Sequence, residues 1–162
     1  MRDMSDKLNA FTLIELVIVM AILGIIGSVV LVRWPSDTVT LEAQAQQMVN
    51  DIRYIQFLAH TRNKSYRINF ISSSQYTFTE TDGTTAVNHP ATENNVITLA
   101  SGITLSNSGL PGNFIVFNRK GVPYTDAGVT TALSGNATIT LTGSSGSRTV
   151  TISSETGKVL VS

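Results

Sequence analysis

Residues 11–32 read FTLIELVIVMAILGIIGSVVLV, an apolar stretch in which Glu15 is the only charged residue. As an α-helix, this stretch would be about 33 Å long, which is enough to cross the hydrocarbon core of a bilayer. A soluble helix is rarely apolar on every face over so many turns. A cleaved secretory signal has a shorter apolar region, of about 7–15 residues, followed by a small-residue site. The stretch therefore predicts a membrane-embedded stem, and an ordinary single-span anchor is the alternative.

Glu15 places a carboxylate inside this stretch, and a charge at a membrane centre costs about 2.5–3.5 kcal/mol. The stretch contains no Lys, Arg or His that could pair with it. A partner would have to come from elsewhere, and the amino group of a neighbouring chain is the better candidate. Protonation of Glu15 in the membrane is the alternative. A costly carboxylate of this kind argues against an ordinary anchor.

The residues that flank the stretch predict its orientation and its end. Arg2 and Lys7 precede it, whereas only Arg33 lies close on the other side. Because basic residues favour the cytoplasmic side, this bias places the N-terminus in the cytoplasm and the rest of the chain outside the membrane. Trp34 suits an interfacial position. Pro35 lacks an amide hydrogen and predicts a kink or break in the helix.

A second helix is predicted from about residue 38 to residue 62, because apolar residues recur there at three- and four-residue steps. Polar residues fall mostly on its other faces, so the helix is amphipathic and should be covered by a sheet. The residues of the apolar stripe are Leu41, Ala45, Met48, Ile52, Ile55 and Ala59.

Beyond Lys64 the apolar residues alternate with polar ones, which predicts strands with one buried and one solvated face. Residues 84–95 are polar and predict a loop, and Gly143-Ser-Ser-Gly146 predicts the tip of a hairpin. The expected fold class is α+β: a long N-terminal helix, membrane stem plus amphipathic half, packed on an antiparallel β-sheet domain. The expected strands are 66–71, 75–79, 96–99, 103–105, 114–117, 137–141, 148–152 and 159–161.

The composition supports no catalytic, metal or cofactor site. Eleven basic residues balance eleven acidic ones, and the absence of cysteine excludes disulfides, thiolate metal sites and a Cys nucleophile. His60 and His89 have no metal-binding spacing around them, and both are predicted to be surface residues. Asp82 and Asp126 are each followed closely by a glycine and are interpreted as turn residues. The prediction is a protein without enzymatic activity, metal or cofactor.

The segment Ala10-Phe11-Thr-Leu-Ile-Glu15 resembles the prepilin cleavage and methylation motif of type IV pilins and type II secretion pseudopilins. The resemblance implies that a prepilin peptidase removes a leader of residues 1–10 by cutting between Ala10 and Phe11, and methylates the new Phe11 amine. It also implies that Glu15 pairs with the N-terminal amine of an adjacent subunit during assembly. Ala10 stands where this family nearly always has glycine.

The resemblance divides the chain into the leader, a transmembrane and filament-core helix of residues 11–34, and a periplasmic pilin-like domain of residues 35–162. It implies a single-pass protein of the bacterial inner membrane that becomes part of a filament after assembly. The implied partners are other pilins or pseudopilins, through the N-terminal helix, the prepilin peptidase and an inner-membrane assembly platform.

The C-terminal half is similar to the GspH/FimT family of minor pseudopilins and minor pilins. The similarity rests on Phe117, the turn at Gly121 and the segment Ile152-Ser-Ser-Glu-Thr-Gly157-Lys158-Val159. It implies a subunit of a type II secretion pseudopilus or a type IV pilus, positioned near the tip. A major structural pilin is one alternative.

A DNA-binding minor pilin of competence and DNA uptake is the other alternative, with Arg119, Lys120 and Lys158 as weak DNA-contact candidates. DNA-binding relatives carry a Gly-Arg-x-Arg motif near the C-terminus, whereas this chain has Gly157-Lys158-Val159-Leu160, without the second basic residue. The net charge is zero, so nucleic acid is not the expected partner. Arg62, Lys64 and Arg67 are expected to cluster at the helix end, where they complement the helix dipole.

Overall fold

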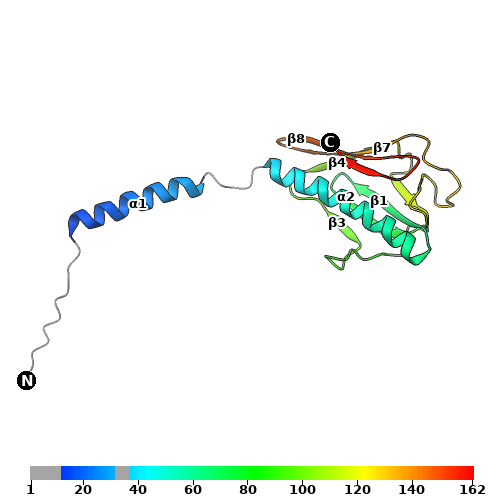
Figure 1. Cartoon of the computed structure of the whole chain (residues 1–162), viewed down its shortest axis with the longest axis horizontal. Coiled ribbons are helices and arrows are strands. Elements are labelled where there is room, and N and C mark those ends of the chain that lie inside the picture. The colour runs from blue at the N-terminus through cyan, green and yellow to red at the C-terminus, as the bar shows by residue number, and fades with distance from the viewer. Residues whose placement is uncertain (1–11, 32–36) are drawn as a thin grey trace, which may run out of the picture. The chain divides into compact units, whose positions relative to one another are not determined.

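The computed structural model describes residues 12–31 and 37–162. The chain divides into two units, of which the first ends at Ser36 and the second comprises Asp37–Ser162. The first unit contains helix α1 (Leu13–Leu31), and the second begins with helix α2 (Asp37–Arg62) (Figure 1). Pro35 lies outside the described residues, so its kink stays a prediction, as do the segment boundaries 1–10, 11–34 and 35–162.

Helix α1 is apolar on all sides, and its side chains up to Ile26 are exposed. Leu13 is 81% exposed, Met20 66% and Ile25 67%. Among the described residues, no helix combines the length and the hydropathy needed to cross a membrane. No described residue of its own unit covers the apolar surface of α1.

Helix α2 buries the predicted stripe, and all six of its residues are at most 1% exposed. This confirms the amphipathic helix, which begins one residue earlier than expected. The helix ends in a Schellman motif: the Lys64 N–H donates to the Ala59 carbonyl at 3.2 Å and the Asn63 N–H to the His60 carbonyl at 3.3 Å. Asn63 has a φ of 51°, the left-handed conformation that this motif requires.

In the described part of the chain, nine strands form two antiparallel sheets. The antiparallel prediction is therefore confirmed, while the division into two sheets was not predicted. The first sheet has the order β3-β2-β1-β5-β6, and the second has the order β4-β7-β8-β9. The strands are β1 (Tyr66–Ser72), β2 (Gln75–Glu80), β3 (Val96–Thr98), β4 (Thr104–Ser108), β5 (Phe114–Phe117), β6 (Pro123–Tyr124), β7 (Ala137–Gly143), β8 (Gly146–Ile152) and β9 (Val159–Val161).

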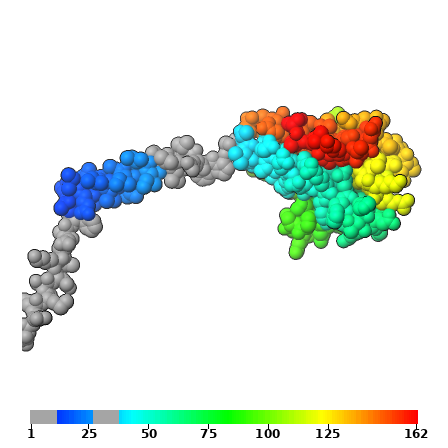
Figure 2. All heavy atoms as spheres, in the orientation of Figure 1, coloured from blue at the N-terminus to red at the C-terminus, as the bar shows by residue number. Residues whose placement is uncertain are grey.

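Helix α2 packs against strands of both sheets, namely β1 and β5 of the first and β7, β8 and β9 of the second. Their inward side chains form one core with the α2 stripe, for example Ile68 from β1 and Ile139 from β7. In Figure 2 the red C-terminal strand lies beside the cyan helix, in agreement with the contact between β9 and α2. Helix α2 therefore joins the two sheets into one unit.

Period-two alternation explains the register of the β7–β8 hairpin. Ala137, Ile139 and Leu141 are buried, while the threonines between them are half-buried. Gly143 pairs with Gly146 across a two-residue loop, as the sequence predicts. Elsewhere the observed strand bounds differ from the expected ones by a few residues. Strand β6 was not predicted, because a strand of two residues is too short to show alternation.

Candidate functional site

Glu15 lies in the first turn of α1, where its amide donates to the carbonyl and the hydroxyl of Thr12 at 3.0 and 3.3 Å. Within the described residues its carboxylate forms no ion pair. Ala10 and Phe11 lie outside the described residues. The cleavage site, the methylated amine and the pairing role of Glu15 therefore stay predictions.

The three weak DNA-contact candidates come from two turns that lie side by side at the C-terminal end of α2. Arg119 and Lys120 are in the turn between β5 and β6, and Lys158 is in the turn between β8 and β9. Gln56 on α2 joins the two turns, because its Nε2 donates to the Gly157 carbonyl at 2.7 Å and to the Gly121 carbonyl at 3.4 Å. The sequence pattern did not show that these turns meet.

A row of three hollows, here called the basic track, runs over this end of the unit, and Lys120 lines all three. The first, of about 320 Å³, also contains Phe57, His60 and Lys158. The second, of about 460 Å³, adds Arg119. The third, of about 590 Å³, continues past Arg119 to Lys64 and Tyr124. In Figure 2 the yellow segment around residue 125 adjoins the C-terminal part of the helix.

The expected cluster of Arg62, Lys64 and Arg67 is only partly correct. Lys64 forms an ion pair with Glu80 at 3.3 Å. Arg67 lies away from the helix end: its guanidinium sits 3.8 Å from the centroid of the Phe114 ring, and burial lowers its pKa. The cause is strand alternation, which turns Arg67 to the face of β1 opposite α2.

A buried polar cluster of Asp51, Tyr76 and His89 was not predicted, and the surface placement of His89 is wrong. Asp51 is 3% exposed and His89 7%. One Asp51 carboxylate oxygen lies 2.8 Å from Nε2 of His89, and the other accepts from the Tyr76 hydroxyl at 2.5 Å. Burial, with Asp51 adding to it, raises the pKa of Tyr76 far above its usual range. The hydrogen bond between His89 and Asp51 holds the loop of residues 84–95 against α2.

The cluster is structural in character, because both ring nitrogens of His89 are engaged. Nδ1 accepts from the Ala91 amide at 3.1 Å, so the ring hydrogen sits on Nε2 and is donated to Asp51. No ring nitrogen is left for proton transfer or a metal. A sequence signal existed: Asp51 falls on the buried face of α2 beside Met48 and Ile55, and a buried carboxylate needs a partner.

The positions of His60, Asp82 and Asp126 agree with the predictions. His60 is exposed, with Nδ1 3.3 Å from the Arg119 carbonyl. Asp82 and Asp126 act as turn residues: hydrogen bonds hold the pKa of each carboxyl below its usual range, the Thr85 hydroxyl first for Asp82 and the Thr131 amide first for Asp126.

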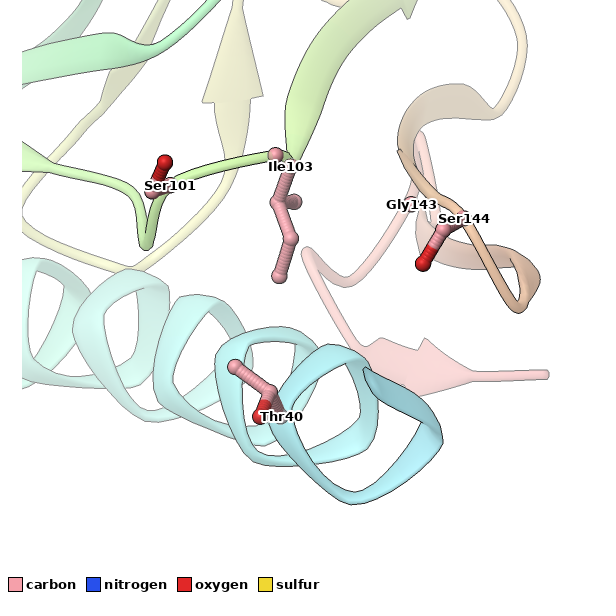
Figure 3. A pocket seen from close by; sticks show the side chains of 6 residues that line it. Thr40, Ser101, Ile103, Gly143 and Ser144 are labelled. Atoms are coloured by element: carbon pink, nitrogen blue, oxygen red, sulfur yellow. The ribbon is translucent and has the colours of Figure 1, made fainter. Parts of the chain in front are cut away.

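A small pocket of about 130 Å³ lies near the start of α2, between Thr40, the Ser101–Gly102 turn and the β7–β8 hairpin tip. Figure 3 shows the Ile103 side chain extending toward the helix between Ser101 and Ser144. The lining contains no titratable side chain, so it offers no acid or base. Among the residues that the structure describes, no group of three or more His, Asp or Glu could hold a metal ion.

Comparison with protein families gives two matches. The model of the prokaryotic N-terminal methylation motif matches residues 7–31, and the model of the type II transport protein GspH matches residues 44–157. The chain belongs to the GspH family. The GspH match begins within α2 and covers strands β1 to β8, and it ends at Gly157, just before Lys158 and β9. No curated protein matches the chain.

Solved structures show that the GspH-family fold is shared at low identity. The minor pseudopilin EpsH from the type 2 secretion system of Vibrio cholerae is 14% identical, with a TM-score of 0.56, over 75% of this chain and 95% of that one. The type IV minor pilin FimU of Pseudomonas aeruginosa is 13% identical, with a TM-score of 0.54, over 78% and 91% of the two chains. The family matches confirm the resemblance to the GspH/FimT family, and the solved structures show that the fold is shared.

Proposed function

We propose that this GspH-family chain is a non-enzymatic minor pseudopilin or minor pilin that assembles into a type II secretion pseudopilus or a type IV pilus, near its tip. The observation that carries the proposal is α1, an exposed apolar helix with one charge, Glu15, that precedes a GspH-type unit. Such a surface is stable only against lipid tails or other apolar helices. A stem that lies among lipid tails before assembly and packs against other stems in the filament is covered in both states.

Processing at the N-terminus is the first step of this proposal. A prepilin peptidase cuts between Ala10 and Phe11 and methylates the Phe11 amine. Mass spectrometry of the chain from peptidase-positive cells should give a mature N-terminus at Phe11 carrying one methyl group, whereas peptidase-negative cells should retain residues 1–10. A chain that still begins before Phe11 when the peptidase is present would contradict the processing step.

In the proposed state before assembly, the chain is a single-pass inner-membrane protein with its N-terminus in the cytoplasm and the unit from residue 35 in the periplasm. Its partners are the membrane assembly platform and the stems of other pilins or pseudopilins. The methylation motif at residues 7–31 supports this arrangement. A major structural pilin and a DNA-binding pilin stay alternatives, and a nucleic-acid probe is included in the experiment on the basic track below.

Glu15 should act in assembly, by pairing with the amine of an adjacent subunit. A charge-assisted hydrogen bond contributes about 1.5–3 kcal/mol, so Glu15→Ala should reduce incorporation into filaments about 10- to 100-fold. Insertion into the membrane should be unchanged or improved, because a carboxylate has been removed from an apolar stretch. The measurement is the ratio of filament to membrane chain on immunoblots of sheared cells.

The matched control is Glu93→Ala, which removes an exposed carboxylate from the loop of residues 84–95 and should leave the ratio unchanged. Normal incorporation of the Glu15→Ala chain would exclude the pairing role. A loss of membrane insertion in that variant would point to a different defect.

A further inference from the structure

We propose that the basic track binds an extended acidic segment of a partner protein. This surface lies wholly within the Asp37–Ser162 unit, and the inference does not depend on the processing or pairing of the N-terminal stem. Three properties of the track support it: unpaired cations, an exposed aromatic ring and a free hydrogen-bond acceptor.

Three cations of the track, Arg119, Lys120 and Lys158, are exposed, whereas Lys64 at its far end is paired with Glu80. Ion pairs among the described residues join Lys64 to Glu80 and Arg148 to Glu42, and none involves Arg119, Lys120 or Lys158. The end of α2 is already capped, because the Ala59 and His60 carbonyls accept from the Lys64 and Asn63 amides. An overall charge of zero means that the excess of positive charge here is local.

An aromatic ring accompanies these charges. Phe57 is 66% exposed and lines the same hollow as Lys120 and Lys158. Exposed aromatic side chains beside cations are typical anchors of protein interfaces. In a partner segment with carboxylates on both sides of an apolar side chain, the apolar side chain would pack on the Phe57 ring and the carboxylates would pair with the cations.

Gln56 favours a peptide over nucleic acid. Its amide nitrogen is committed to the carbonyls of Gly121 and Gly157, and its Oε1 accepts no hydrogen bond within the described residues. A peptide backbone offers N–H donors to such an acceptor, whereas a phosphate backbone offers none.

The shape of the track suits an extended segment more than a single ion. The hollows have volumes of about 320, 460 and 590 Å³ and follow one another along Lys120. Each can accept one or two side chains, so successive residues of a strand-like segment would occupy the row.

The test uses the full chain in detergent micelles and a fluorescent peptide of glutamates with one central phenylalanine, at low ionic strength. Fluorescence anisotropy should show saturable binding that a glutamine-for-glutamate peptide lacks. The double variant Lys120→Gln/Lys158→Gln should weaken binding about tenfold or more, and Phe57→Ala should weaken it about fivefold.

Two control variants match these changes. Arg62→Gln removes an exposed cation from the same end of α2 but outside the three hollows, and Ile71→Ala removes an apolar side chain that is 55% exposed elsewhere. Both should change the affinity less than about twofold. Thermal unfolding of every variant checks that the fold is kept.

Three results would overturn the inference. The first is no binding of the glutamate peptide at low ionic strength. The second is an equal loss of binding in Arg62→Gln and in Lys120→Gln/Lys158→Gln, which would mean a diffuse charge effect. The third is binding of a single-stranded oligothymidylate more tightly than the peptide, which would assign the track to nucleic acid.

Discussion

Replacing Asp51 with alanine is expected to lower the free energy of unfolding of the Asp37–Ser162 unit by about 2–4 kcal/mol. The substitution leaves the Tyr76 hydroxyl and the His89 Nε2–H without an acceptor in a buried site, where each unsatisfied group costs about 1–3 kcal/mol. Urea unfolding of the residue 37–162 fragment measures the change. The fragment is suitable because the whole buried core lies between Leu41 and Val159.

Asn50→Ala is the matched control, since it makes a similar change at the adjacent, exposed position of α2 and should alter the free energy of unfolding by less than about 0.5 kcal/mol. Tyr76→Phe removes one of the two donors. In the Tyr76→Phe background, Asp51→Ala should therefore cost less than in the wild-type unit. Equal costs in the two backgrounds, or a loss no larger than that of Asn50→Ala, would show that the cluster does not stabilise the loop.

Gly157→Ala is expected to lower the free energy of unfolding by about 2–4 kcal/mol. Gly157 has a φ of 68°, and a Cβ there would lie 2.3 Å from the Gly121 oxygen and 2.6 Å from Nε2 of Gln56. Alanine would therefore meet backbone strain and separate the two turns that Gln56 joins. The measurement is again urea unfolding of the residue 37–162 fragment.

Two other glycines distinguish the two causes of this loss of stability, which are backbone strain and the close approach of the two turns. A Cβ at Gly102 or at Gly135 would meet nothing within 4 Å, but Gly102 has a φ of 83° whereas Gly135 has no left-handed φ. Gly102→Ala should cost about 1 kcal/mol from strain alone, and Gly135→Ala should be neutral or slightly stabilising. If Gly157→Ala costs no more than Gly102→Ala, the close approach of the two turns is not a constraint.

Local patterns in the sequence predicted the elements of the fold well. The α2 stripe, with Leu41 and Met48 among its members, follows the helical period, and β7 shows the period of a strand. The tip at Ser144-Ser145 follows from the glycines on both sides. Each of these signals depends on residues within a few positions of one another, so no tertiary contact is required to recognise them.

The candidate site was less predictable, because its parts come from distant segments. Arg119 and Lys158 were singled out as separate turn residues, and nothing in their neighbourhoods indicated that Gln56 would join their turns. His89 was misplaced for the same reason: its partner Asp51 lies 38 residues away, and the polar loop around His89 has no period that reveals burial.

The segment from Ala10 to Glu15 was sufficient to recognise an N-terminal methylation motif, and the alternation beyond Lys64 was sufficient to predict an antiparallel β unit. The membrane stem of residues 11–32 stays a prediction. The motif and the alternation are properties of composition and local period, which the chain carries whatever its tertiary contacts. Only the tertiary structure decided that there are two sheets, that His89 is buried against Asp51, and that three cations and Phe57 form one track. Those features depend on long-range packing around α2. Residues far apart in the chain are positioned there by the core that they share and not by their neighbours in sequence.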